Sequence, residues 1–182
     1  MSRWRSGARR LRRWLGLALL AAAVWWLWTD GQWRIAPPIT TGDGAVVRVI
    51  DGDSLEIGGT RLRLLGYDAP EYHQHCTTAS GLVWPCGTAA RDRLVALLGA
   101  GEVVCADRGQ DRYGRTLALC RAGQQDVGAI MVREGLGERL RNPRDTRYLA
   151  EETAARRAGR GVWQGHHQHP ADWRDTNRAA AE

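Results

Sequence analysis

The stretch from Arg61 to Glu71 places two arginines and two carboxylates on one short strand and the turn that ends it. Its alternating apolar residues, Leu62 and Leu64 among them, predict a strand with one face in an interior. Pro70 cannot continue a sheet ladder, so the strand is expected to stop there in a fixed turn. Cations and anions held this close together make a poor hydrophobic core. They are well suited to holding a phosphate through a metal ion.

After residue 44 the sequence shows a series of short strand patterns separated by turn signals. The strands are expected at residues 45–50, 54–57, 60–67, 102–106, 115–121 and 137–141. The helices are expected at residues 87–98, 126–134 and 146–158, and a polar loop at residues 71–85. Gly58-Gly59 predicts a tight hairpin turn between two of the strands. Because these elements do not alternate as βα units do, we expect a small closed sheet with helices packed on its outside and ends.

The formal net charge of +6 comes from the N-terminus. Six arginines precede the first acidic residue, Asp30, and without them 20 basic side chains balance 20 acidic ones. The rest of the chain is therefore formally neutral, and its high pI does not report a broadly basic binding face. Any contact with nucleic acid has to come from the local arrangement of charges.

The first 30 residues differ from the rest in composition. An arginine-rich start is followed by an apolar run at residues 14–28 that ends in tryptophans. This pattern predicts an uncleaved membrane anchor that leaves the remaining chain outside the cytoplasm, in the periplasm or the extracellular space. A cleaved signal peptide is the alternative, and the chain would then be secreted. The expected division is an anchor or signal segment at 1–30, a linker at 31–44, a folded domain at 45–165 and a tail at 166–182.

The four cysteines agree with an exported domain, because disulfides persist in oxidising compartments. Cys76, Cys86, Cys105 and Cys120 allow three pairings, among which sequence alone does not choose. Their spacing favours Cys76–Cys86 and Cys105–Cys120, since each bond would close a short segment within one loop or one strand pair. Four reduced thiols are the alternative that a cytosolic chain would favour.

A second charged segment is the Asp-Gly-Asp of residues 51–53. Alone, it indicates only a hairpin turn. A hairpin closed at Gly58-Gly59 could bring Asp53 beside Asp68, and two crowded carboxylates repel each other unless a cation lies between them. Hard oxygen ligands favour Ca²⁺ or Mg²⁺ over zinc.

A third charged segment, Asp-Arg-Tyr-Gly-Arg, spans residues 111–115. A solvated hairpin loop is the plain interpretation. Gly114, directly before a strand, would nevertheless place Arg115 at the mouth of that strand, and Tyr113 offers a ring and a hydroxyl group.

These three segments, in this order, resemble the staphylococcal nuclease family. The matching strings are Val-Ile-Asp-Gly-Asp-Ser (49–54), Leu-Arg-Leu-Leu-Gly-Tyr-Asp-Ala-Pro-Glu (62–71) and Asp-Arg-Tyr-Gly-Arg (111–115). The resemblance covers about residues 45–164, and the ordered set is far more specific than any single string. It implies an α+β fold, mainly β, built on a five-stranded Greek-key OB-fold barrel with about three packed helices. In this chain an N-terminal hydrophobic helix is expected to precede that fold.

The resemblance also implies a Ca²⁺-dependent phosphodiesterase that acts on DNA and RNA. The roles carried over by position are metal binding by Asp53, Asp68 and the backbone carbonyl of Ala69; catalysis by Arg63, Glu71 and Arg115; and substrate binding by Arg112 and Tyr113. Ala69 stands where a hydroxyl residue is often found, which matters little if the ligand is a backbone carbonyl. The loop after Glu71 lacks the family's lysines, so its grip on nucleic acid is expected to differ.

Two functions follow as hypotheses. The first is an exported, membrane-tethered, Ca²⁺-dependent endonuclease with little sequence preference, monomeric and without an organic cofactor. The second is a catalytically weak OB-fold module that binds single-stranded nucleic acid or a protein partner in the cell envelope. The enzyme is favoured because a degenerate module has no reason to keep all five of the expected acidic and basic residues: Asp53, Arg63, Asp68, Glu71 and Arg115.

Overall fold

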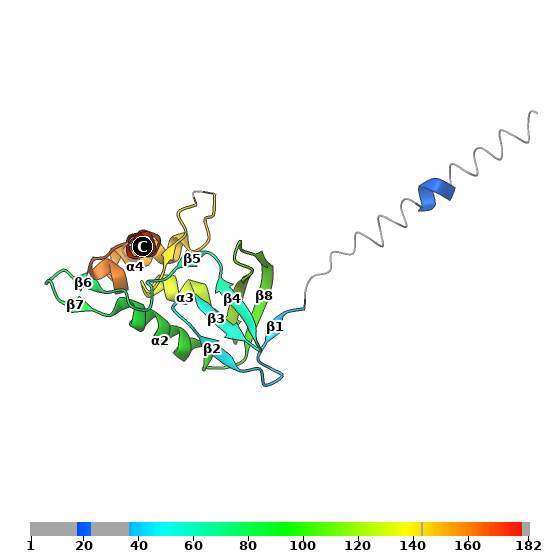
Figure 1. Cartoon of the computed structure of the whole chain (residues 1–182), viewed down its shortest axis with the longest axis horizontal. Helices are drawn as coiled ribbons and strands as arrows, with labels where there is room; N and C mark the ends of the chain where they lie inside the picture. Colours follow the sequence, from blue (N-terminus) through cyan, green and yellow to red (C-terminus); the bar gives the residue numbers. More distant parts are fainter. Residues whose placement is uncertain (1–17, 23–36, 143, 180–182) are drawn as a thin grey trace, which may run out of the picture. The chain divides into compact units, whose positions relative to one another are not determined.

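The computed structural model describes residues 18–22, 37–142 and 144–179 (Figure 1). Contacts divide the chain into two units, residues 1–36 and residues 37–182, and the second unit holds every element discussed below. In the first unit residues 18–22 are helical, and the rest of the anchor or signal segment predicted at residues 1–30 lies outside the described residues. Within the described ranges, no helix has the length and apolar character needed to cross a bilayer.

The main sheet has seven strands. Six of them follow the spatial order β1, β8, β9, β4, β3, β2, and β10 pairs with β9. All neighbours are antiparallel except β4 and β9, which run parallel. The strands are β1 (Ile39–Thr40), β2 (Val47–Val49), β3 (Ser54–Ile57), β4 (Thr60–Leu64), β8 (Val103–Gln110), β9 (Thr116–Ala122) and β10 (Gln125–Asp126). A curled mixed sheet of this order, with helices packed against it, fits the α+β OB-fold class predicted from the sequence (Figure 1).

Two small sheets make up the rest of the β-structure in the described part of the chain. One pairs β5 with β11, and the other has the order β12, β6, β7. Their strands are β5 (Tyr67–Asp68), β6 (Cys76–Thr78), β7 (Val83–Trp84), β11 (Glu138–Arg139) and β12 (Gly165–His166).

The β3–β4 hairpin follows directly from local sequence. Gly58 and Gly59 adopt φ angles of 55° and 83°, the left-handed values that a two-residue hairpin turn requires. The resulting register places Ser54 opposite Arg63. Alternation along both strands then turns the leucines and Ile57 of the hairpin inward, so the charged ends of the strands meet at one edge of the sheet.

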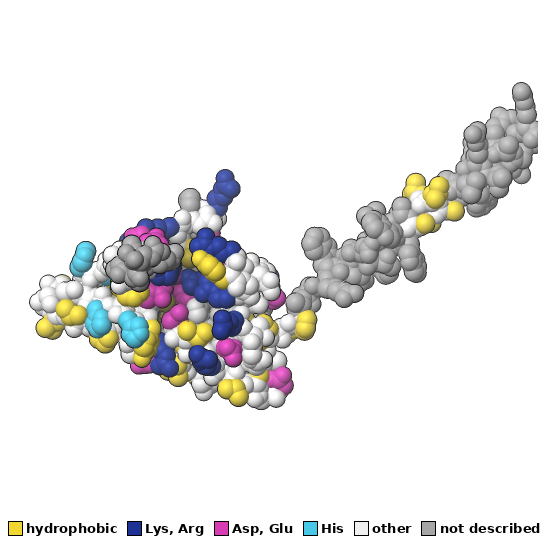
Figure 2. Space-filling view, viewed as in Figure 1, with side chains coloured by type: hydrophobic (Ala, Val, Ile, Leu, Met, Phe, Trp, Pro, Cys, Tyr) yellow, Lys and Arg dark blue, Asp and Glu magenta, His cyan; other side chains and the backbone are white. Residues whose placement is uncertain are grey.

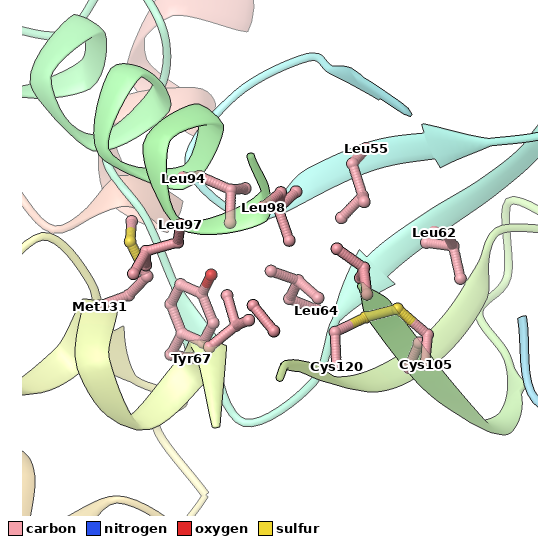
Figure 3. Close-up of a cluster of buried hydrophobic side chains, with 14 of the residues drawn as sticks. Leu55, Leu62, Leu64, Tyr67, Leu94, Leu97, Leu98, Cys105, Cys120 and Met131 are labelled. Atoms are coloured by element: carbon pink, nitrogen blue, oxygen red, sulfur yellow. A yellow bond between two sulfur atoms is a disulfide. The ribbon is translucent and has the colours of Figure 1, made fainter. Parts of the chain in front are cut away.

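Three helices lie at the predicted positions: α2 (Cys86–Leu98), α3 (Val127–Arg133) and α4 (Leu149–Arg157). The leucines of α2 face the leucines of the sheet, and Tyr67 and Met131 fill the space beside them (Figure 3). Asp126 caps α3 by accepting a hydrogen bond from the Ala129 amide (2.9 Å). The apolar side chains of the sheet and of α2 are close-packed in this core, and this packing holds the strand ends in fixed positions.

Both favoured disulfide pairings are confirmed. Cys105 and Cys120 lie directly opposite each other on β8 and β9, and their bond is buried within the core (Figure 3). Cys76 on β6 is bonded to Cys86 at the start of α2, across a sequence separation of 10. The second bond fastens the loop that follows Glu71 to the helix beneath it.

The structure differs from expectation in the polar segments. Residues 39–40, in the segment expected as a linker, pair with β8. Residues 71–85, expected as a loop, contain the β6–β7 hairpin. The three strands concerned, β1, β6 and β7, are only two or three residues long, so they carry no periodic pattern from which they could be predicted.

The C-terminal segment expected as a tail contains a ten-residue helix, α5 (Pro170–Ala179), coloured red in Figure 1. Its start at Pro170 is typical of a first helical position. Four of its side chains, at residues 172 and 175–177, are polar and exposed. Ion pairs connect the helix to the domain: Arg141 with Asp172, and Arg174 with Asp68. Pro170, Ala171, Trp173 and Arg174 form its covered face, a helical spacing with too few apolar residues to stand out in the sequence.

Candidate active site

Asp53 and Asp68 lie at neighbouring strand ends. Asp53 directly precedes β3, and Asp68 ends β5. Gly66, with φ of 102°, lets the chain turn sharply between β4 and β5. The Tyr67 hydroxyl donates a hydrogen bond to the Gly52 carbonyl (2.9 Å), which fastens the two strand ends to each other. Both carboxylates are consequently buried, each residue being 2% exposed.

One guanidinium lies between the two carboxylates. Arg63 on β4 donates from Nη1 to Asp53 Oδ1 (2.9 Å) and from Nη2 to Asp68 Oδ1 (2.5 Å). Buried anions this close together are tolerated only when positive charge compensates them. The hairpin register thus brings Asp53, Arg63 and Asp68 into one cluster.

The two carboxyl groups have different environments. Burial raises the pKa of Asp53 well above its ordinary value, by more than the adjacent Arg63 lowers it. Burial also raises the pKa of Asp68, but hydrogen bonds and charge from Arg174 and Arg63 outweigh burial and leave that pKa below its ordinary value. Arg174 and Arg63 therefore favour the ionised form of Asp68, whereas burial favours the neutral form of Asp53.

A polar cleft of about 670 Å³ opens over this cluster. Its lining residues are Asp51, Arg61, Arg63, Glu71, Arg112, Tyr113, Arg115, Ala171, Arg174 and Asp175. Five residues with expected roles thus share one cleft: Arg63, Glu71, Arg112, Tyr113 and Arg115. The other three, Asp53, Asp68 and Ala69, are buried and do not line it. Basic and acidic side chains gather in the middle of the face that Figure 2 shows.

Asp111 orders the loop that carries Arg115. Its Oδ1 accepts hydrogen bonds from the amides of Tyr113 (2.8 Å) and Arg115 (3.0 Å), and its Oδ2 accepts one from Arg115 Nε (2.8 Å). Slight burial raises the pKa of Asp111, but these donors outweigh it and hold the pKa below its ordinary value. Gly114 closes the turn at φ of 77°. The Arg115 guanidinium is thereby oriented before any ligand binds.

Tyr113 offers an aromatic surface at the edge of the cleft. Its residue is 65% exposed, and the guanidiniums of Arg112 and Arg115 lie 4.8 and 5.7 Å from the ring centroid. An exposed ring between two cations suits a nucleotide, because the base can stack while the phosphate meets positive charge.

The cleft also contains residues to which the sequence analysis gave no role: Asp51, Arg61, Ala171, Arg174 and Asp175. Asp51 and Arg61 lie inside segments already singled out, and nothing in their spacing indicated which way they face. Arg174 and Asp175 lie on α5, and Pro170 was the one local signal that a helix begins nearby.

The donor atoms at Asp53 and Asp68 fit a divalent cation that prefers oxygen. Ala69 lies beside them, its amide donating to Asp53 Oδ2 (3.0 Å), and Glu71 lies in the cleft above. Among the described residues, no three His, Cys, Asp or Glu side chains form a group that could hold a metal by themselves. Coordination would therefore require a backbone carbonyl and water, both ordinary Ca²⁺ ligands. Arg63 shows that positive charge is favoured between the two carboxylates.

Comparison with known proteins agrees with this geometry. Residues 61–165 match the family model described as "Staphylococcal nuclease homologue". A micrococcal nuclease of Shigella flexneri is 34% identical over 154 residues, covering 75% of this chain and 83% of that protein. A thermonuclease of Staphylococcus intermedius is 30% identical over 141 residues, covering 74% of this chain and 82% of that protein. The succinoglycan biosynthesis protein ExoI of Rhizobium meliloti (strain 1021) is 34% identical over 123 residues, and this chain spans only 64% of its length.

Proposed function

The chain belongs to the staphylococcal nuclease family and is a nuclease, and from this premise we propose that it is a Ca²⁺-dependent endonuclease that cuts DNA and RNA with little sequence preference. The observation that carries the proposal is the shared cleft, in which Arg63, Glu71 and Arg115 converge above the buried pair Asp53 and Asp68.

The proposed chemistry is phosphodiester hydrolysis. The substrate resists attack because its negative charge repels nucleophiles, and further charge develops on the phosphoryl oxygens in the transition state. Arg115, held by Asp111, is placed to bind those oxygens without rearranging during the reaction. Arg63 would do so as well once the ion replaces it between the two buried carboxylates. Glu71 at the cleft wall is placed to accept a proton from, or to orient, the attacking water.

Asp53, Asp68 and the carbonyl of Ala69 would hold the divalent ion. When bound, that ion supplies positive charge beside the scissile phosphate. The choice of Ca²⁺ is supported by the all-oxygen donor set, which lacks the thiolate or imidazole ligands that favour zinc.

Recognition of the nucleic acid is proposed to rest on its backbone. The cleft contributes guanidiniums from Arg61 and Arg112 and the exposed ring of Tyr113. Guanidiniums bind phosphate in any sequence, and an aromatic ring stacks on any base. These groups therefore support broad sequence tolerance in both DNA and RNA.

Calcium removal tests the proposed activity. The purified full chain is expected to hydrolyse single-stranded and duplex DNA and RNA in Ca²⁺, to lose that activity in excess chelator, and to regain it when Ca²⁺ is restored. Gel analysis of linear and circular substrates would follow cleavage and distinguish internal cuts from cuts at chain ends. Equal activity in chelator would reject the role of the ion. Binding without cleavage in Ca²⁺ would favour the alternative of an OB-fold binding module.

The proposed location is outside the cytoplasm, with the N-terminal segment as a membrane tether or, if it is cleaved, with the chain secreted. The composition of residues 1–30 and the two disulfides support this location. Protein isolated from its native cells is expected to resist thiol alkylation at all four cysteines until it is reduced, as mass spectrometry would show. Four thiols that react without reductant would contradict the proposed compartment.

A further inference from the structure

Helix α5 forms one wall of the cleft and sends an arginine to the buried carboxylates. Arg174 donates from Nη1 to Glu71 Oε1 (2.6 Å) and to Asp68 Oδ1 (3.0 Å), and from Nη2 to Asp68 Oδ2 (2.8 Å). The guanidinium therefore grips both oxygens of Asp68 and reaches the proposed base. These contacts span sequence separations of 106 and 103 residues. Arg174 also lies beyond residues 61–165, the part of the chain that the family model matches.

Arg174 takes the place that a metal ion would need. A Ca²⁺ ligand oxygen lies about 2.3–2.6 Å from the ion. Arg174 and Arg63 together take three of the about four lone-pair directions of the Asp68 carboxylate, which leaves one direction on Oδ2 for an ion. The positive charge of Arg174 would also repel the approaching ion. Metal and Arg174 therefore compete for Asp68.

We propose that Arg174 is an internal cation that closes the metal site, so that a divalent ion has to displace it from Asp68 and Glu71 before the site is competent. This inference rests on the proposed function. Its consequence is that the C-terminal helix sets the concentration of divalent cation at which the nuclease becomes active. Where the divalent ion is scarce, the contact of Arg174 with Asp68 and Glu71 would keep the metal site closed and the nuclease inactive.

The attachment of Arg174 is suited to displacement. Its side chain is 31% exposed, so the guanidinium can leave Asp68 for the solvent-filled cleft without crossing the core. The other ion pair of α5, between Arg141 and Asp172, has both side chains more than half exposed and contributes little to stability. Pro170 is buried and Ala171 and Trp173 are half-buried, so α5 has contacts of its own with the domain and does not depend on Arg174 to stay there.

The test is a calcium titration of the full chain without substrate, by isothermal calorimetry. The variant Arg174→Met keeps an unbranched, flexible side chain and removes its charge. Its Kd for Ca²⁺ is expected to be at least about tenfold lower than that of the unsubstituted protein, the effect of one charge-assisted contact that no longer competes. Arg157→Met, an exposed arginine near the end of α4, removes the same charge elsewhere and is expected to leave the Kd within about twofold.

The outcomes separate this inference from the proposed function. If the unsubstituted protein binds Ca²⁺ and Arg174→Met binds it equally or more weakly, Arg174 does not compete with the ion and the inference is overturned, while the nuclease proposal stands. If neither protein binds a divalent ion, the metal site itself is refuted. Should Arg174→Met fail to fold, Arg174→Lys, which keeps the charge but loses the bidentate fork, decides in the same way: a lower Kd supports the inference and an unchanged or higher Kd overturns it.

Discussion

Replacing Arg115 by alanine is expected to lower kcat/KM for phosphodiester hydrolysis by about 10³-fold, the usual scale for an arginine that stabilises a phosphoryl-transfer transition state. Asp111 orients the Arg115 guanidinium toward the cleft before substrate arrives. The fold should survive the change, because the Arg115–Asp111 ion pair is partly exposed and contributes no more than about 1 kcal/mol. Initial rates on a fluorogenic oligonucleotide, with thermal unfolding in parallel, would separate catalysis from stability.

Two variants sharpen this experiment. Arg115→Lys keeps the charge but not the planar fork, and it should recover only part of the lost rate. Arg108→Ala removes an exposed arginine of β8 that does not line the cleft, so its rate should remain within about twofold of the unsubstituted protein. Equal losses in Arg108→Ala and Arg115→Ala would show that the enzyme responds to net charge and not to a placed guanidinium.

The sequence predicted the hairpin and the helices because their signals are local. Gly58-Gly59 fixes the turn, and the turn fixes the register that sets Ser54 opposite Arg63. Alternating leucines then decide which face of each strand is buried. The register places Asp53 beside Arg63, and the turn at Gly66 then brings Asp68 to the same edge. The disulfide pairings followed for the same reason, since each joins segments close in sequence.

The contribution of α5 could not be predicted in this way. Arg174 reaches Asp68 across 106 residues, and no periodic pattern or spacing links the two. The covered face of the helix has only three apolar residues, Pro170, Ala171 and Trp173, and lacks the leucines that identified α2. A long-range ion pair such as this one depends on where α5 packs against the domain, which only the three-dimensional structure shows.

Gly87 is the position where a single methyl group is expected to damage both stability and catalysis. The loop from Glu71 to Gln74 wraps against the first turn of α2, with the Gly87 amide donating to the Gln74 carbonyl (3.1 Å). A Cβ at Gly87 would lie 1.7 Å from the Glu71 carbonyl oxygen and 2.9 Å from the carbonyl carbon of Tyr72. These are backbone atoms, so the loop itself has to move. The nearby bond between Cys76 and Cys86 restrains that movement.

Gly87→Ala is therefore expected to lose about 2–3 kcal/mol of unfolding free energy through overpacking. It should also lose about 100-fold in kcat, because the displaced backbone carries Glu71 out of position by roughly 1 Å. Gly101→Ala is the matched control: a Cβ there meets no atom within 4 Å, and its stability should change by less than about 1 kcal/mol. Urea unfolding gives the first quantity and single-turnover cleavage the second. A Gly87→Ala protein that unfolds and cuts like the unsubstituted one would mean that the loop carrying Glu71 is not held against α2, and that the position of this carboxylate is set by other contacts.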